Sequence, residues 1–135
     1  MNVNPLAAVA RLMTASCVFG ALLCAGAQPA QAQDAIAADP KHYSVEFEND
    51  QVRVLRVVYG PGEKSTMHEH PESVAVYLTD GHIRITLPDG RTGEPRVKAG
   101  QAMWHRAGQH AIENLGSTPF ELVLTELKQP SAALK

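Results

Sequence analysis

The chain has 135 residues, of which 44% are hydrophobic and 19% are charged, and a chain of this length builds one hydrophobic core. It has 12 Lys and Arg against 14 Asp and Glu, a net charge of −2, with no basic run, which excludes the usual electrostatic site for nucleic acid. We therefore expect a single domain whose partner is a small molecule.

Residues 1–32 have the layout of a secretory signal peptide. Arg11 is the only charged residue of this segment, and an apolar run follows at residues 12–23 before Ala30-Gln31-Ala32, which matches an A-x-A cleavage site. A helix over that run would span only about 18 Å, which is short of the roughly 30 Å of a bilayer core. We predict cleavage after Ala32, a periplasmic or secreted location, and no stable membrane anchor after cleavage.

Both cysteines, Cys17 and Cys24, lie within this segment. The processed chain would contain no cysteine, so we expect it to have neither a disulfide nor a thiol nucleophile. We interpret residues 33–42 as an N-terminal linker and residues 129–135 as a C-terminal tail.

Residues 43–128 have the pattern of an all-β domain. Short runs rich in Val, Ile, Tyr and Leu alternate with Gly, Pro and Asp, and no apolar stripe follows helical spacing for ten residues. We expect strands at residues 43–48, 52–59, 65–70, 73–79, 82–87, 96–98, 101–105, 110–113 and 120–127. So many short strands in one domain predict a sandwich, a jelly roll or a small barrel.

Two of these strands differ in the spacing of their apolar residues. Ile83, Ile85 and Leu87 alternate with polar residues, so we expect one face of that strand to be buried. Residues 74–78 are apolar throughout, which predicts a strand that is covered on both faces.

Three histidines form the most informative pattern in the chain. His68 and His70 are separated by one residue, and residues i and i+2 of a strand point to the same face. His110 lies far downstream in another expected strand. If the two strands are close in space, three imidazoles meet at one point, and imidazole is the commonest transition-metal ligand. We predict a metal site with open coordination positions at these three residues.

Two segments resemble the two sequence motifs of the cupin superfamily. The first motif is Gly, five residues, His-x-His and a strand that closes on Gly, and it is similar to residues 62–81. The second is Gly, a short strand, a Gly-containing turn, His, three residues and Asn, and it is similar to residues 100–114. The resemblance implies a cupin double-stranded β-helix, or jelly-roll barrel, with a metal inside its mouth. It also implies a homodimer that pairs through sheet edges, for which residues 39–50 would supply the exchanged or paired strand.

The sequence departs from the family pattern at both motifs. The first motif usually has a metal-binding Glu seven residues before its closing Gly, and this position is Val74, which cannot ligate a metal. The second motif usually has Pro where Arg106 stands, and one more residue between its Gly and its His. Glu72 and Glu113 are therefore candidates for a replacement ligand, of which we name Glu72 as the fourth ligand; the simpler interpretation is a site of three histidines alone.

The three-histidine interpretation has a parallel in the family. Some cupins, including thiol dioxygenases and a diketone-cleaving dioxygenase, bind iron(II) with three histidines and no Glu. The resemblance implies a mononuclear dioxygenase-type enzyme acting on a small chelating organic substrate, with Fe(II) favoured and Zn, Mn, Ni or Cu as other metals. Two alternatives stay open: a non-catalytic metal- or small-ligand-binding module, and a sugar isomerase or epimerase, which needs an acid–base pair.

Further residues are candidates for a substrate pocket, and these are Tyr77, Arg84, Met103, Trp104 and His105. The apolar and aromatic ones would form a pocket wall or pack in the core. Arg84 and Arg106 would bind an anionic substrate or lie at a solvated rim. We expect His42 and His82 on the surface, and Asn114 to cap a turn.

Overall fold

The computed structural model describes residues 33–128, so the expected signal peptide and the tail at residues 129–135 lie outside the described residues. The elements are β1 (Gln33–Asp34), α1 (Ala35–Ala38), β2 (Tyr43–Glu48), β3 (Val52–Tyr59), β4 (His68–His70), β5 (Ser73–Tyr77), β6 (Gly81–Thr86), β7 (Thr92–Gly93), β8 (Arg96–Val97), β9 (Ala102–His105), β10 (Gly108–Asn114) and β11 (Phe120–Leu127). The prediction of an all-β fold is confirmed, and each of the nine expected strands is present. No helix within residues 33–128 has the length and apolar character that a membrane span requires.

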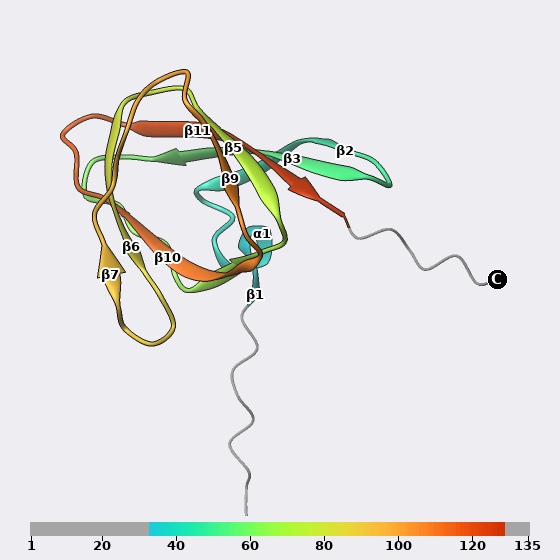
Figure 1. The fold of residues 1–135 in the computed structure, drawn as a ribbon, viewed down its shortest axis with the longest axis horizontal. Coiled ribbons are helices and arrows are strands. Elements are labelled where there is room, and N and C mark those ends of the chain that lie inside the picture. Colours follow the sequence, from blue (N-terminus) through green and yellow to red (C-terminus); the bar gives the residue numbers. More distant parts are fainter. Residues whose placement is uncertain (1–32, 129–135) are drawn as a thin grey trace, which may run out of the picture.

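The strands form two sheets that enclose the interior of a barrel (Figure 1). One sheet has the order β1-β4-β10-β6-β7, with β8 also paired to β6, and the other has the order β2-β3-β11-β5-β9. The chain crosses between the sheets at each step from β3 to β6 and again from β8 to β11. This alternation is the double-stranded β-helix, or jelly roll, that we expected.

Strand β11 is the middle strand of the five-stranded sheet and shows how the sequence builds the core. Its residues are alternately buried and half-buried, and Phe120, Leu122 and Leu124 all point inward. Their partners in β3 are Tyr59, Val57 and Leu55, which are also buried. Burial of each such side chain contributes about 1.5–3 kcal/mol to the free energy of folding. Because alternate residues of a strand share a face, the face with these apolar residues becomes the core.

Gly81, at the start of β6, permits a close approach of Phe120 and Val97. A Cβ atom at this position would lie 2.5 Å from Cδ2 of Phe120 and 3.1 Å from Cγ2 of Val97. Real Cβ atoms do not approach other carbons so closely, so only glycine fits. This contact accounts for the glycine at position 81 of this chain.

Residues 33–42, which we predicted to be a linker, are part of the folded domain. Strand β1 pairs in parallel with β4, with Gln33 opposite His68, and Ala35 of α1 is fully buried. Asp34 caps α1 by accepting a hydrogen bond of 3.0 Å from the Ile36 N–H. A two-residue strand and a four-residue helix are too short to have a periodic pattern, which is why the sequence did not indicate them.

Two further expectations about exposure are wrong. Residues 74–78 are not covered on both faces, because Val76 and Leu78 are 37% and 41% exposed on the outer side. His42 is not on the surface, because it is 6% exposed and its ring stacks on Tyr59 with 4.3 Å between ring centroids. The Asp39 carboxylate holds its Nδ1 at 2.7 Å. His42 thus anchors the N-terminal segment to the barrel.

Candidate metal centre

The register between β4 and β10 brings three histidines together. His110 is the direct antiparallel partner of His68, and His70 follows two residues later on the same face. One nitrogen from each ring lies within 4.8 Å of the others, and the ring centroids are 4.9–5.3 Å apart. The structure therefore brings together the three histidines that the sequence indicated.

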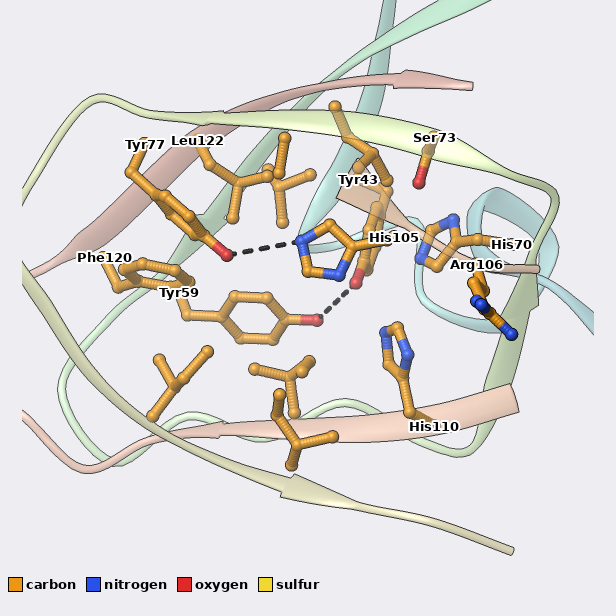
Figure 2. Close-up of a pocket in the computed structure, with 16 residues that line it drawn as sticks. Tyr43, Tyr59, His70, Ser73, Tyr77, His105, Arg106, His110, Phe120 and Leu122 are labelled. Carbon is orange, nitrogen blue, oxygen red and sulfur yellow. Dashed lines mark hydrogen bonds between the residues drawn. The ribbon is translucent and has the colours of Figure 1, made fainter. Parts of the chain in front are cut away.

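The backbone determines the tautomer of His68. Its Nδ1 lies 2.8 Å from the Thr66 carbonyl oxygen, which can only accept a hydrogen bond, so Nδ1 carries the hydrogen. Nε2 then has a free lone pair, and it accepts a hydrogen bond of 2.9 Å from the Tyr43 hydroxyl. The Tyr59 hydroxyl donates in turn to Tyr43 at 3.0 Å (Figure 2). Nε2 of this fully buried ring could thus bind a metal after its hydrogen bond with the Tyr43 hydroxyl breaks.

A carboxylate determines the tautomer of His70. Its Nδ1 donates to Oε1 of Glu126 at 2.5 Å, which leaves Nε2 with the lone pair. The other Glu126 oxygen accepts a hydrogen bond of 2.6 Å from Nε of Arg53, and Arg53 also binds the carboxylate of Asp34. A chain of charged contacts therefore runs from the N-terminal segment to one of the three histidines.

Glu126 is the functional residue that sequence reasoning missed. It is separated from His70 by 56 residues, so no motif connects the two. One feature of β11 could have indicated it. Glu126 is only 1% exposed and continues the inward series of Phe120, Leu122 and Leu124. A carboxylate at an inward position of a strand needs a specific buried partner.

The pKa shifts of His68 and His110 keep these two imidazoles neutral. Burial lowers the pKa of His110 to about 3, and His70 and His68 add to this effect. Burial also lowers the pKa of His68. Burial acts to raise the pKa of Glu126, but hydrogen bonds from His70 and Arg53 outweigh it, so the pKa is lowered. The neutral imidazole is the form that ligates a metal.

The two acidic residues proposed as a fourth ligand do not join the histidines. Glu72 is exposed in the turn between β4 and β5. Glu113 is three residues from His110, and an odd offset in a strand points to the opposite face. Its carboxylate binds Lys64 at 3.1 Å and Arg84 at 2.8 Å. Within residues 33–128 the candidate ligand group is formed by histidines alone.

A cavity of about 110 Å³ extends from the histidines into the barrel (Figure 2). His70, His110 and Arg106 lie at one end of it, and Phe120 and Leu122 lie toward the other. Two of the predicted pocket residues, Tyr77 and His105, are among its lining residues, and the Tyr77 hydroxyl lies 3.4 Å from His105 Nε2. Burial raises the pKa of Tyr77 and lowers the pKa of His105, so both groups are neutral near pH 7.

The other three pocket candidates do not line this cavity. Arg84 forms ion pairs with Glu94 and Glu113 on the outer side of β6. Trp104 and Met103 are 52% and 39% exposed. Both belong to β9, an edge strand in which the side chains alternate, so the inward position of His105 places Trp104 on the outer face.

His82 and Asn114 complete the comparison with the sequence. His82 is half-buried on β6, with its Nε2 3.9 Å from a Glu94 oxygen, and does not line the cavity. Asn114 is 1% exposed, donates to the carbonyl oxygens of Tyr59 and Thr118, and accepts from the Gly116 N–H. It therefore stabilises the turn after β10, as we expected.

Comparisons with known proteins agree with this architecture. A family model described as a cupin domain matches residues 55–126. A crystal structure of a cupin domain from Bordetella pertussis Tohama I is 26% identical, has a TM-score of 0.61, and the match covers 64% of this chain and 92% of that one. An uncharacterised protein with a double-stranded β-helix domain from Klebsiella pneumoniae subsp. pneumoniae MGH 78578 is 25% identical, with a TM-score of 0.53 and coverage of 68% and 78%.

A more distant structure shows the fold alone. It is an RmlC-like cupin family protein from Methanocaldococcus jannaschii, 20% identical, with a TM-score of 0.51, and the match covers 68% of this chain and 85% of that one. No curated protein matches this chain in sequence. The chemistry of the site must therefore be argued from its own residues.

Proposed function

Because this chain belongs to the cupin family, with its cupin domain at residues 55–126, we propose that it is a metal-dependent enzyme of the dioxygenase type with Fe(II) as the favoured metal. Its substrate is a small organic molecule that chelates the metal. The observation that carries the proposal is the convergence of His68, His70 and His110, of which His70 and His110 line an internal cavity. Within residues 33–128 this ligand group contains no carboxylate.

The residues present fit a divalent transition metal. Three neutral imidazoles supply nitrogen ligands, and the partners Thr66 and Glu126 orient two of the rings from behind, as outer-shell partners do in metalloproteins. Three neutral ligands leave the charge of the ion uncompensated and open coordination positions available. Iron(II) bound there would supply sites for a chelating substrate and for dioxygen. Zinc, manganese, nickel and copper also bind imidazole, so the metal content must be measured.

The surrounding residues would position and shield the reacting groups. Arg53 keeps Glu126 ionised and in place, and Glu126 holds the proton of His70 at Nδ1. The apolar walls of the cavity exclude bulk water from one side of the centre. Tyr77 and His105 form a neutral hydrogen-bonded pair inside the cavity.

The positions of the acidic residues favour an oxygenase over an isomerase or epimerase. Such an isomerase needs an acid–base pair at its substrate, and Glu72 and Glu113 were the acidic candidates. Neither of them lines the cavity. A non-catalytic binding module would use the same site as the oxygenase. Turnover of a substrate therefore distinguishes the two possibilities.

Metal analysis and oxygen uptake test the proposal. The purified protein, loaded with Fe(II) without oxygen, is compared with a His68→Ala/His110→Ala variant and with His82→Ala as the matched control. We expect about one equivalent of metal in the parent and in the control. We expect none in the double variant, because it lacks two of the three imidazoles that would bind the metal. The parent and the control should consume oxygen with a chelating organic acid, thiol or diketone from a panel of small molecules.

Each other result points to a different conclusion. Metal binding without oxygen uptake on any panel member would favour the binding module. A folded parent that retains no metal at any loading would contradict the metal centre itself.

We also propose that the protein is exported and cleaved after Ala32, on the support of the sequence pattern of residues 1–32. Cleavage further downstream would remove Gln33 and Asp34, which contact β4 and Arg53. The intact mass of the protein recovered from the periplasm or the medium tests this. We expect a chain that begins at Gln33, and a full-length chain retained in the membrane fraction would contradict it.

A homodimer that pairs through β2 is our proposal for the assembly. Strand β2 is an edge strand of the five-stranded sheet, and its Val45 and Phe47 are 46% and 53% exposed. Exposed apolar side chains on a free strand edge favour pairing with a second chain. Light scattering should give twice the chain mass for the parent and the single mass for Phe47→Lys. A parent of single mass would contradict the dimer.

A further inference from the structure

We infer that the cavity selects a small oxygen-chelating carboxylate, of the 2-oxo acid class, that carries a short, branched and uncharged apolar tail. This inference rests on the proposed function, because the carboxylate head would lie at the metal centre. The lining of the cavity away from the histidines determines the chemical nature of the tail, which the proposed function leaves open.

The mouth of the cavity favours an anion. Among the described residues 33–128, its lining contains no Asp or Glu, and Arg106 is the only lining residue with a permanent charge. Arg106 lies at the same end as His70 and His110 (Figure 2). In the part of the chain that the structure describes, Arg106 has no ion pair of the kind that holds Arg53, Arg56 and Arg84. The guanidinium is thus free to bind a carboxylate through two parallel hydrogen bonds.

The acidic residues nearest the histidines are already paired: Asp34 with Arg53, Asp39 with His42, and Glu126 with Arg53 and His70. Glu126 lies behind His70, is 1% exposed, and is paired with Arg53. A divalent ion held by three neutral histidines would add further positive charge at the mouth. Coulomb attraction and hydrogen bonding at the mouth both favour an anionic head group whose oxygen atoms can bind the metal and accept hydrogen bonds from Arg106.

The interior of the cavity is apolar on both sides. The apolar lining residues come from both sheets, and they are Val57, Ala75, Ile83, Ile85, Ile112, Phe120, Leu122 and Leu124. The polar groups in this part already have partners, since Tyr59 donates to Tyr43 and Tyr77 lies against His105. A charged tail would lose its hydration here without gaining a partner, whereas an apolar tail gains free energy from burial.

The size of the cavity limits the tail. Its volume of about 110 Å³ is smaller than the roughly 150 Å³ of an apolar protein cavity that accepts benzene. An aliphatic tail of about four carbons therefore fits, and a large aromatic system does not. Burial of each methylene tightens binding by about fourfold, so such a tail should improve affinity by at least tenfold over the same head without it.

Three probes with the same head and different tails test the inference. Pyruvate has only a methyl group, 4-methyl-2-oxopentanoate has a branched aliphatic tail, and 2-oxoglutarate has a second carboxylate. Binding to the metal-loaded protein without oxygen is measured by calorimetry. We expect 4-methyl-2-oxopentanoate to bind at least tenfold more tightly than either of the other two.

Two variants assign the effect to the apolar lining and to the charged mouth of the cavity. Ala75→Val adds two methyl groups to the lining, so it should abolish the preference for the branched tail. Arg106→Gln should weaken all three probes by at least tenfold, because it removes the charge that faces the head. Arg84→Gln, which removes an arginine outside the cavity, is the matched control and should change none of them.

The outcomes distinguish this inference from the proposed function. Equal binding of the three probes, tighter binding of 2-oxoglutarate, or no binding of any probe to the metal-loaded protein would overturn the inference. Selective binding of the branched acid without oxygen uptake would support the inference while the proposed function fails. Oxygen uptake that is fastest with a charged-tail substrate would support the function and overturn the inference.

Discussion

The inward face of β11 connects two regions of the molecule that are built in opposite ways. At one end Phe120 packs against Gly81 and apolar neighbours, and at the other end Glu126 lies among His70 and Arg53. Both side chains are 1% exposed. A buried carboxylate needs full pairing to offset its lost hydration. Replacement of a buried ion pair by apolar residues of similar volume often leaves a fold equally stable or more stable. The apolar end therefore stabilises the barrel, and the charged end serves the site.

The largest effect should come from the apolar end. Phe120→Ala removes a buried ring, so we expect the free energy of unfolding to fall by about 3–5 kcal/mol, while metal content at low temperature stays at the parent value. Urea unfolding and elemental analysis measure the two quantities. Val123→Ala, on the outer face of the same strand, is the control and should cost about 1 kcal/mol or less. Loss of metal with unchanged stability would contradict this division.

The charged end should respond in the opposite way. Glu126→Gln keeps the shape of the side chain but removes the charge that holds His70, so we expect metal affinity to fall by about 10- to 100-fold. Titration against a competing chelator measures this. Glu121→Gln provides a matched control, because Glu121 is on the same strand but points outward to Arg56. Equal affinities of the two variants would mean that Glu126 does not position the ligand.

Acid should destabilise the metal-free protein through the histidines. The pKa of His110 is about 3 in the folded chain, and the pKa of His68 is also lowered, whereas an unfolded imidazole titrates near 6.5. Between about pH 6.5 and 3 the unfolded chain thus binds more protons than the folded chain. The free energy of unfolding should fall with falling pH, by up to about 1.4 kcal/mol per pH unit for each such histidine.

Urea unfolding at pH 7, 6 and 5 measures this slope. The variant His110→Gln, which cannot take up a proton, should have a shallower slope than the parent. The same slope in both proteins would show that His110 does not cause the acid sensitivity.

The smallest effect concerns the hydroxyl next to His68. Tyr43 donates to the Nε2 lone pair that a metal would need, so this hydrogen bond must break on metal binding. A hydrogen bond of this kind contributes about 1 kcal/mol, so Tyr43→Phe should bind the metal about fivefold more tightly. The chelator titration measures it, with Tyr77→Phe as the control. Weaker binding in Tyr43→Phe would instead assign a supporting role to the hydroxyl.

Local patterns in the sequence were enough to predict the fold class and the grouping of the three histidines. Alternation of apolar and polar residues depends on neighbouring positions only, so it indicated the strands and their inward faces. The spacing of His68 and His70 placed both imidazoles on one face for the same reason. The resemblance of residues 62–81 and 100–114 to the cupin motifs then connected His110 to them, and strand pairing confirms that connection.

Only the tertiary structure decided which residues support and surround the histidines. Glu126, Arg53 and Asp34 come from three distant parts of the chain, and strand register brings them behind His70. The edge position of β9 left Met103 and Trp104 exposed, although their apolar character was compatible with a pocket wall. Contacts of this kind depend on which strands become neighbours, and that is a property of the whole packed barrel.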